Sequence, residues 1–200
     1  MKRILRGLAA LSALACVCVQ FAAPVRAQGV SDPNQWIVKG GVTLPREGTP
    51  KRVSSTWLTG GLEYQAGNPD GQRVSSIEAL FSTANDNIQE DFAFPVSVEY
   101  SMLSLMYNYR IRQVDPSGVA IGNVLFYGAG VGAQAIWAKI QDENDSTNNF
   151  DDDRIFAGAN VFIGYEIGAN LEIEAKYQMV FGKVQDQRMN TLQLLFGFKF

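Results

Sequence analysis

The chain has 200 residues, 46% of them hydrophobic, with 20 acidic and 17 basic side chains and no histidine. This acidic balance argues against nucleic acid as a partner. No stretch after residue 27 approaches the about 18 consecutive apolar residues of a membrane-spanning helix. If the mature protein crosses a membrane, it must therefore do so with strands that close into a barrel.

The N-terminus has the three parts of a secretory signal peptide. An uncharged apolar run over residues 8–19 follows three basic side chains, Lys2, Arg3 and Arg6. Val25-Arg26-Ala27 then supplies small residues for cleavage before Gln28, so we expect residues 1–27 to be the signal and 28–200 the barrel domain. A retained anchor is disfavoured because the run is shorter than the about 20 residues a spanning helix needs.

Cleavage would change both the charge and the chemistry of the chain. Cys16 and Cys18 lie in the signal, so the mature protein would have no cysteine for a disulfide or a thiolate metal site. Losing four basic residues leaves 13 basic and 20 acidic side chains, a formal charge of 13 − 20 = −7. Cys16 matches a lipobox only loosely, which disfavours a lipoprotein.

Apolar and polar residues alternate with the period of a strand in four segments of the first half. These are residues 36–44, 57–64, 74–83 and 101–110. The alternation turns Lys39, Thr43, Glu63, Glu78 and Arg110 toward the barrel interior and the large apolar side chains outward. Around Glu99 the parity is ambiguous, which permits a bulge or a segment that emerges from the membrane.

Three further segments, 124–138, 155–167 and 171–181, alternate more regularly. Gly168-Ala169-Asn170 forms a predicted tight turn between the last two, which places Glu166 opposite Glu172. Gly128, Gly130 and Gly132 fall on the inner face. We expect these glycines to line a narrow lumen in which large side chains on the opposite strand need room.

The last ten residues, T-L-Q-L-L-F-G-F-K-F, form an eighth strand with an apolar side chain at every even position. Its outward aromatic residues, Phe196, Phe198 and Phe200, are similar to the C-terminal signal by which bacterial outer-membrane barrels reach the barrel-assembly machinery. We therefore predict that these three residues are an assembly signal.

An even count of eight strands places both ends of the barrel on the periplasmic side. The more polar connections, 45–55, 84–95, 139–154 and 182–190, would then be external. Aromatic girdles are expected at both interfaces, from Trp36, Tyr64, Tyr109, Tyr127 and Phe200 on the periplasmic side and Phe81, Trp137 and Phe181 on the outer side. A soluble lipocalin-like barrel is the alternative, because it would alternate in the same way with its faces reversed.

Four stretches resemble the family of small outer-membrane β-barrel domains that includes opacity-type and outer-membrane-protein-A-like barrels. They are L-M-Y-N-Y-R (105–110), L-F-Y-G-A-G-V-G (125–132), A-G-A-N-V-F-I-G-Y-E-I-G-A-N-L-E-I-E-A-K-Y (157–177) and the final G-F-K-F. The resemblance implies an all-β, eight-stranded antiparallel up-and-down transmembrane barrel in the bacterial outer membrane. It says little about activity, because strand and glycine patterns define the family.

The residues present argue against an enzyme. Without histidine, the barrel hydrolases, acyltransferases and proteases that depend on one are set aside. Glu172 and Glu174 could form an acid pair of the glycosidase kind. We favour instead an interior charge network with nearby lysines, made of Lys39, Glu166, Glu172, Glu174, Lys176 and Lys199.

Two further patterns have weaker functional readings. The acidic segment from Asp142 to Asp153 could collect divalent cations, but it lacks the glycine and terminal glutamate of an EF-hand and reads better as a solvated loop. G-A-G-V-G resembles a phosphate-binding loop, yet it lies inside a predicted strand with no helix after it. No cofactor or metal is expected.

We interpret the mature chain as a structural and surface-interaction protein with four external loops. It would be a monomer, in contact with outer-membrane lipid and lipopolysaccharide. The alternative is a narrow porin-like channel or a carrier for small or apolar solutes. Side chains nearly fill a barrel of eight strands, which disfavours the alternative.

Overall fold

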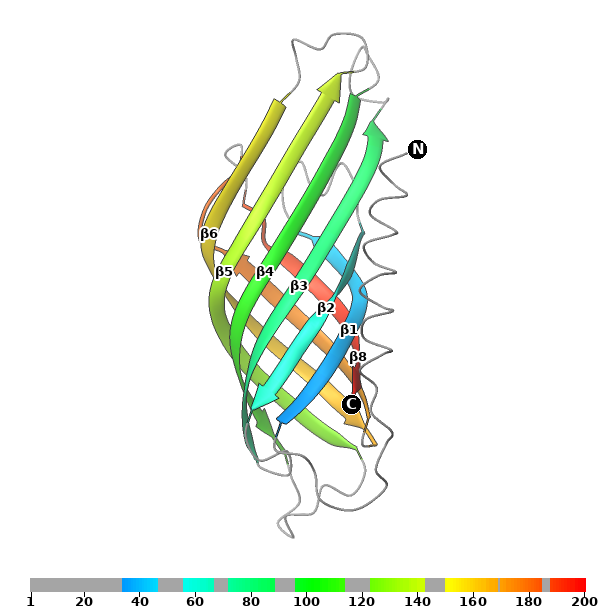
Figure 1. Cartoon of the computed structure of the whole chain (residues 1–200), viewed down its shortest axis with the longest axis vertical. Helices are drawn as coiled ribbons and strands as arrows, with labels where there is room; N and C mark the ends of the chain where they lie inside the picture. The colour runs from blue at the N-terminus through cyan, green and yellow to red at the C-terminus, as the bar shows by residue number, and fades with distance from the viewer. Residues whose placement is uncertain are drawn as a thin grey trace. The chain divides into compact units, whose positions relative to one another are not determined.

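The computed structural model describes residues 34–46, 56–66, 72–88, 96–113, 123–142, 150–168, 170–184 and 188–200. The predicted signal peptide therefore lies outside the described residues. Within the described ranges, eight antiparallel strands follow one another into a closed barrel (Figure 1), and no helix is long and apolar enough to span a membrane. The strands are β1 (Asn34–Pro45), β2 (Trp57–Ala66), β3 (Arg73–Ile88), β4 (Val96–Arg112), β5 (Val124–Asp142), β6 (Phe150–Ile167), β7 (Leu171–Val180) and β8 (Thr191–Lys199). The predicted fold class is confirmed.

The barrel closes where β1 pairs with β8. The pairing runs from Ile37 opposite Lys199 to Pro45 opposite Thr191. The start of β1 and the end of β8 consequently meet at one end of the barrel, which we call the terminal end; the opposite end is the far end. The turn at Gly168, whose φ of 62° suits glycine, also lies at the terminal end.

The strands differ in length, and this shapes the far end. Four have 9 to 12 residues, namely β1, β2, β7 and β8, whereas β3 to β6 have 16 to 19. The β2–β3 ladder stops at Leu58 opposite Thr83 and the β6–β7 ladder at Gly158 opposite Val180. The four long strands therefore project beyond the others as a wall, which we call the tall wall (Figure 1).

The tall wall corrects two predicted loops. Residues 84–88 and 96–100 were expected in an external connection or in an ambiguous segment, but they pair as strands up to Ile88 opposite Val96. Likewise Asp152 and Asp153 belong to β6 and pair with β5. Polar side chains on a strand that is in water do not oppose backbone pairing. Predicting loops from polarity therefore made these two loops too long. The ladders on both sides of β4 run through Glu99 in regular register.

Side chains alternate between the inner and outer faces as the prediction of a membrane barrel requires. Outward residues are apolar and open, with Ile77 54%, Leu105 55% and Phe196 64% exposed, whereas inward Glu78 and Arg110 are each 1% exposed. A soluble barrel of the lipocalin kind has the reverse arrangement. The outward apolar surface is therefore one that lipid would cover.

Glycine and phenylalanine exchange places across the β5–β6 ladder. Gly128 lies opposite Phe162, and Phe126 lies opposite Gly164. A Cβ on either glycine would overlap the facing aromatic ring. The expectation that inner-face glycines make room for large side chains is thus confirmed at this pair.

The lumen is apolar at its far end. Its buried residues there form a cluster of Trp57, Ala84, Val98, Tyr100, Met102, Ile136, Ala138, Val180, Val184 and Met189. Val184 and Met189 come from the segment 182–190, predicted as a polar external connection. Each is only 3% exposed, so the side chains of Val184 and Met189 point inward over the lumen.

Candidate functional site in the barrel lumen

Ten charged side chains meet in the terminal half of the lumen, and we call them the interior charge network. Each occupies an inward position of its strand, and no side chain is more than 10% exposed. The members are Lys39, Glu63, Glu78, Arg110, Arg112, Glu166, Glu172, Glu174, Lys176 and Lys199. Five cations meet five carboxylates, so the network as described is neutral.

Lys39 lies at the centre of the upper part of this network, on the side of the far end. Its Nζ is 2.5 Å from Glu63, 2.8 Å from Glu78, 2.9 Å from Glu174 and 3.4 Å from Glu172. These partners come from β2, β3 and β7. A single ammonium group therefore ties β1 to its neighbour and to strands across the lumen.

Arg110 lies at the next level of the network, closer to the terminal end. Its Nη1 donates to Glu172 at 2.8 Å, and Nη2 lies 3.4 Å from both Glu63 and Glu174. The guanidinium stacks on the Phe126 ring, with Cζ 3.9 Å from the ring centroid. The aromatic face thus supports the cation from one side, and both side chains are buried in the lumen.

Glu166 lies at the level of the network nearest the terminal end, where its carboxylate contacts three cations. Arg112 Nε donates to Glu166 Oε1 at 2.8 Å, Lys199 Nζ lies 2.9 Å from it and Arg110 Nη1 3.3 Å. Arg112 also donates to Gln65 Oε1 at 3.1 Å. All five carboxylates of the network thus have at least two cationic neighbours.

The structure brings together all six residues predicted for this network. Lys199 approaches Glu166, and Lys39 and Lys176 both lie 2.9 Å from Glu174. Sequence reasoning placed Glu63, Glu78 and Arg110 inside but did not pair them with these lysines. It missed Arg112, whose signal was the alternation continuing two residues past Arg110.

Three carboxylates of the network have the spacing of a metal site. Oxygens of Glu63, Glu78 and Glu174 lie within 4.8 Å of one another. The Lys39 ammonium is 2.9 Å or less from each of them. The protein's own cation thereby satisfies the cluster. Of the acidic segment considered for divalent cations, residues 143–149 lie outside the described part of the chain.

An uncharged polar layer separates the network from the apolar far end. The hydroxyls of Thr43, Thr59 and Ser82 form a triangle with edges of 2.6, 2.9 and 3.2 Å. Asn160 donates to Asn108 at 3.0 Å on the other side of the lumen. Above this layer the rings of Trp57 and Tyr100 stack with centroids 5.9 Å apart. Successive layers of side chains therefore fill the lumen from one end to the other.

Solved structures with a similar fold come from the bacterial surface. Ail, the attachment invasion locus protein of Yersinia pestis, crystallised with the heparin analogue sucrose octasulfate, aligns with a TM-score of 0.54 and 15% identity over 84% of this chain and 98% of that chain. Neisserial surface protein A aligns with a TM-score of 0.52 and 12% identity over 83% of this chain and 94% of that chain. The chain has the fold of the small outer-membrane β-barrels. No family model matches it, and no curated protein sequence does.

These comparisons confirm the predicted resemblance at the level of fold. The expected location in a bacterial outer membrane agrees with that of these neighbours. At such low identity, similarity of fold carries no activity from one barrel to another. The role of this chain has to be argued from its own residues.

Proposed function

We propose that residues 28–200, freed of the signal at 1–27, span the bacterial outer membrane as a plugged barrel. The protein would act there as a structural and surface-interaction protein rather than as an enzyme. The observation that carries this proposal is the filled lumen, closed by a neutral charge network at one end and an apolar cluster at the other.

Strand length and aromatic residues support the membrane placement. The short strands match the about 9 to 11 residues that a tilted spanning strand needs. Outward aromatics gather toward both ends of the band: Trp36 packs on Tyr64 near the terminal end, with centroids 4.8 Å apart, and Phe181 is 64% exposed at the far end. With an even strand number, this arrangement favours a periplasmic terminal end and an external far end.

The lumen residues argue against transport and catalysis. A solute would have to part ion pairs such as Arg110–Glu172 and displace the Phe126 ring. Breaking such buried pairs is costly. The carboxylates are also poorly placed for acid–base chemistry, because each is held between at least two cations. These features favour a structural role over a narrow channel or a carrier.

Surface interaction would occur at the tall wall. Its strands extend about 20 Å further along their length than the short ones, judged from about six extra residues. Residues 139–154 contain six acidic and two basic side chains, a net charge of −4. We infer a cationic partner for this wall. A polysulfated ligand like the one bound by Ail would be repelled.

The remaining partners follow from the closed barrel. Each strand has two hydrogen-bonded neighbours, so no unpaired edge drives association through the membrane part, and a monomer in contact with lipid and lipopolysaccharide is expected. Phe196 and Phe198 point outward on β8, with 64% and 48% exposed, and Phe200 follows β8. Recognition of these three residues by the barrel-assembly machinery stays a prediction.

Conductance in planar lipid bilayers tests the proposal. We expect the purified, folded barrel to insert without discrete current steps. Glu172→Gln together with Arg110→Gln should also give no steps, because the apolar cluster still closes the far end when this pair is removed. Regular steps from the wild-type protein would replace the proposed role with that of a narrow channel.

A further inference from the structure

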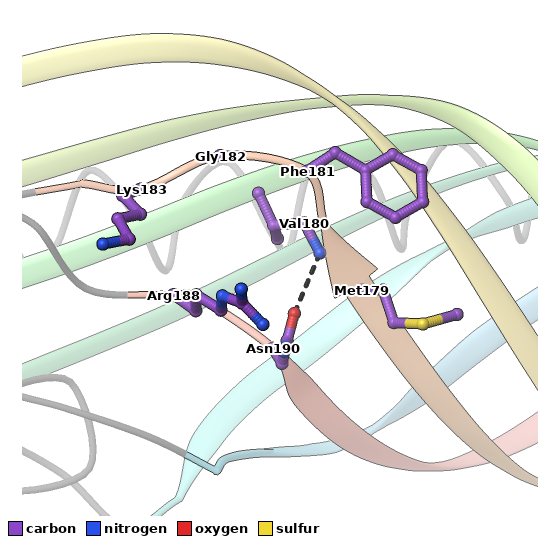
Figure 2. Close-up of a pocket in the computed structure, with 7 residues that line it drawn as sticks. All are labelled: Met179, Val180, Phe181, Gly182, Lys183, Arg188 and Asn190. Carbon is purple, nitrogen blue, oxygen red and sulfur yellow. Dashed lines mark hydrogen bonds between the residues drawn. The ribbon is translucent and has the colours of Figure 1, made fainter.

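A crevice opens where β7 and β8 separate at the far end. Seven residues line it, and its volume is about 340 Å³ (Figure 2). They are Met179, Val180, Phe181, Gly182, Lys183, Arg188 and Asn190. None of these residues belongs to the charge network or to the predicted assembly signal.

The crevice exists because one ladder ends before its neighbour. The last β7–β8 pair is Gln178 opposite Thr191, whereas β7 continues along β6 to Val180. Beyond that pair, the amide of Val180 donates to the side-chain oxygen of Asn190 at 3.1 Å, a bond drawn in Figure 2. A side chain thus replaces the backbone ladder and holds the two strands apart.

The lining of the crevice is cationic on one side and apolar on the other. In Figure 2, Lys183 and Arg188 lie on one side of the Val180–Asn190 hydrogen bond, and the side chains of Met179 and Phe181 on the other. Lys183 and Arg188 are both exposed. Within the described ranges, neither of them forms an ion pair.

The position of the crevice along the barrel is that of the lipid headgroups. From Leu171 to Phe181 the chain covers about 33 Å, which at a tilt of about 40° is a height of about 25 Å. The outward apolar band of a membrane barrel is about 25 Å tall. The last outward apolar residue here is Phe181, which directly follows β7. Lys183 therefore lies just beyond the hydrocarbon, at the level of the headgroups.

A third cation approaches the same side of the rim. The backbone amide of Arg46, which follows β1, donates to the carbonyl of Asn190 at 3.0 Å. By backbone position, Arg46, Lys183 and Arg188 therefore lie at the far ends of β1, β7 and β8, away from the acidic tall wall. In a mature chain with a formal charge of −7, this is a local reversal of sign.

We propose that the crevice binds the phosphate group of an anionic membrane lipid, with the attached acyl chain lying along Met179 and Phe181. Lys183 and Arg188 would donate to the phosphate oxygens. Such charge-assisted hydrogen bonds are among the stronger ones in proteins. The proposal rests on the membrane placement argued above, but it does not depend on whether the lumen conducts.

Native mass spectrometry of the folded full-length mature barrel, released from neutral detergent micelles, tests the site. The probes are dimyristoyl phosphatidic acid, dimyristoyl phosphatidylcholine and inorganic phosphate. Wild type should retain one phosphatidic acid in preference to phosphatidylcholine. Lys183→Gln with Arg188→Gln should weaken that retention about tenfold or more. The matched control, Lys139→Gln with Arg154→Gln, makes the same change of charge on the tall wall and should retain the lipid as wild type does.

Three results would overturn the lipid site. One is equal retention of the two lipids by wild type, and another is an equal loss in both double variants, which would indicate unspecific attraction. The third is displacement of the lipid by an equal concentration of inorganic phosphate, which would indicate a simple anion site. Failure of the barrel to insert into lipid vesicles would instead contradict the proposed membrane function, so the two failures are distinguishable.

Discussion

The ammonium group of Lys39 lies 2.5 Å from a carboxylate oxygen of Glu63, although the two residues are not cross-strand partners. The β1–β2 register pairs Lys39 with Gly61, and Glu63 with Ile37. The lysine therefore reaches diagonally past its register partner, and its ammonium also contacts Glu78 and Glu174. The length of its side chain allows one cation to contact carboxylates from several strands.

Replacing Lys39 with methionine should destabilise the barrel strongly. Methionine keeps much of the volume but leaves Glu63, Glu78 and Glu174 facing one another with fewer cations. Breaking a buried pair in this way costs about 3 to 5 kcal/mol. Urea unfolding in lipid vesicles, followed by tryptophan fluorescence, measures the loss. Lys139→Met, on the partly exposed tall wall, is the control and should change stability little.

Lys199→Met should have a smaller effect than Lys39→Met. Lys199 has one close carboxylate, Glu166 at 2.9 Å, and a second, Glu172, at 3.8 Å. Arg110 and Arg112 would still neutralise Glu166. The same urea experiment ranks the two variants. If Lys199→Met unfolded like wild type while bilayer conductance rose sharply, the lysine would be gating a pore and the transport reading would replace the plugged barrel.

Tryptophan quenching tests which face of the barrel meets lipid. Trp36 and Trp137 point outward with 47% and 39% exposed, whereas Trp57 is completely buried in the lumen. Lipids brominated near the headgroup should therefore quench single-tryptophan variants that keep Trp36 or Trp137, and spare one that keeps Trp57. Strong quenching of Trp57 alone would mean that the face assigned to the lumen is the one that meets lipid.

The alternation of apolar and polar residues in the sequence was sufficient to predict the fold. Inward and outward positions along β8 followed from simple alternation, and so did the facing of Glu166 and Glu172 across the turn. Alternation has a period of two residues, so it defines faces well even when strand ends are wrong. It also located all six residues predicted for the interior network.

Strand ends and partners across the lumen could not be predicted in the same way. Asp152 and Asp153 read as a loop because hydrophilic residues are typical of loops, yet strands that leave the membrane can also be polar. Lys39 meets Glu78 through the lumen, and that distance depends on barrel closure and tilt rather than on neighbours in sequence. The inward turn of Val184 and Met189 likewise depends on an apolar far end that several strands build together.

Gly182→Ala should destabilise the far end through a single contact. A Cβ at this position would overlap the ring of Phe156, and the three nearest atoms all belong to that side chain. Such overpacking typically costs about 1 to 3 kcal/mol. In a Phe156→Leu background the cost of Gly182→Ala should shrink, which a double-mutant cycle by urea unfolding measures. If the two changes were additive in the free energy of unfolding, a side chain at position 182 would not contact the Phe156 ring.

The final prediction concerns which end of the barrel faces the outside. β5 ends at Asp142 and β6 begins at Phe150, both at the far end, while residues 143–149 between them lie outside the described part of the chain. A short epitope inserted near Asn148 should leave folding intact, because the paired strands on either side are not interrupted. Antibody should then label intact cells expressing the variant, and heat-modifiable migration on gels should match wild type. An epitope placed after Asn170, at the terminal end, serves as the control and should be labelled only after permeabilisation. Labelling of the Asn148 epitope that also requires permeabilisation would reverse the topology, and with it the assignment of the tall wall to the cell surface.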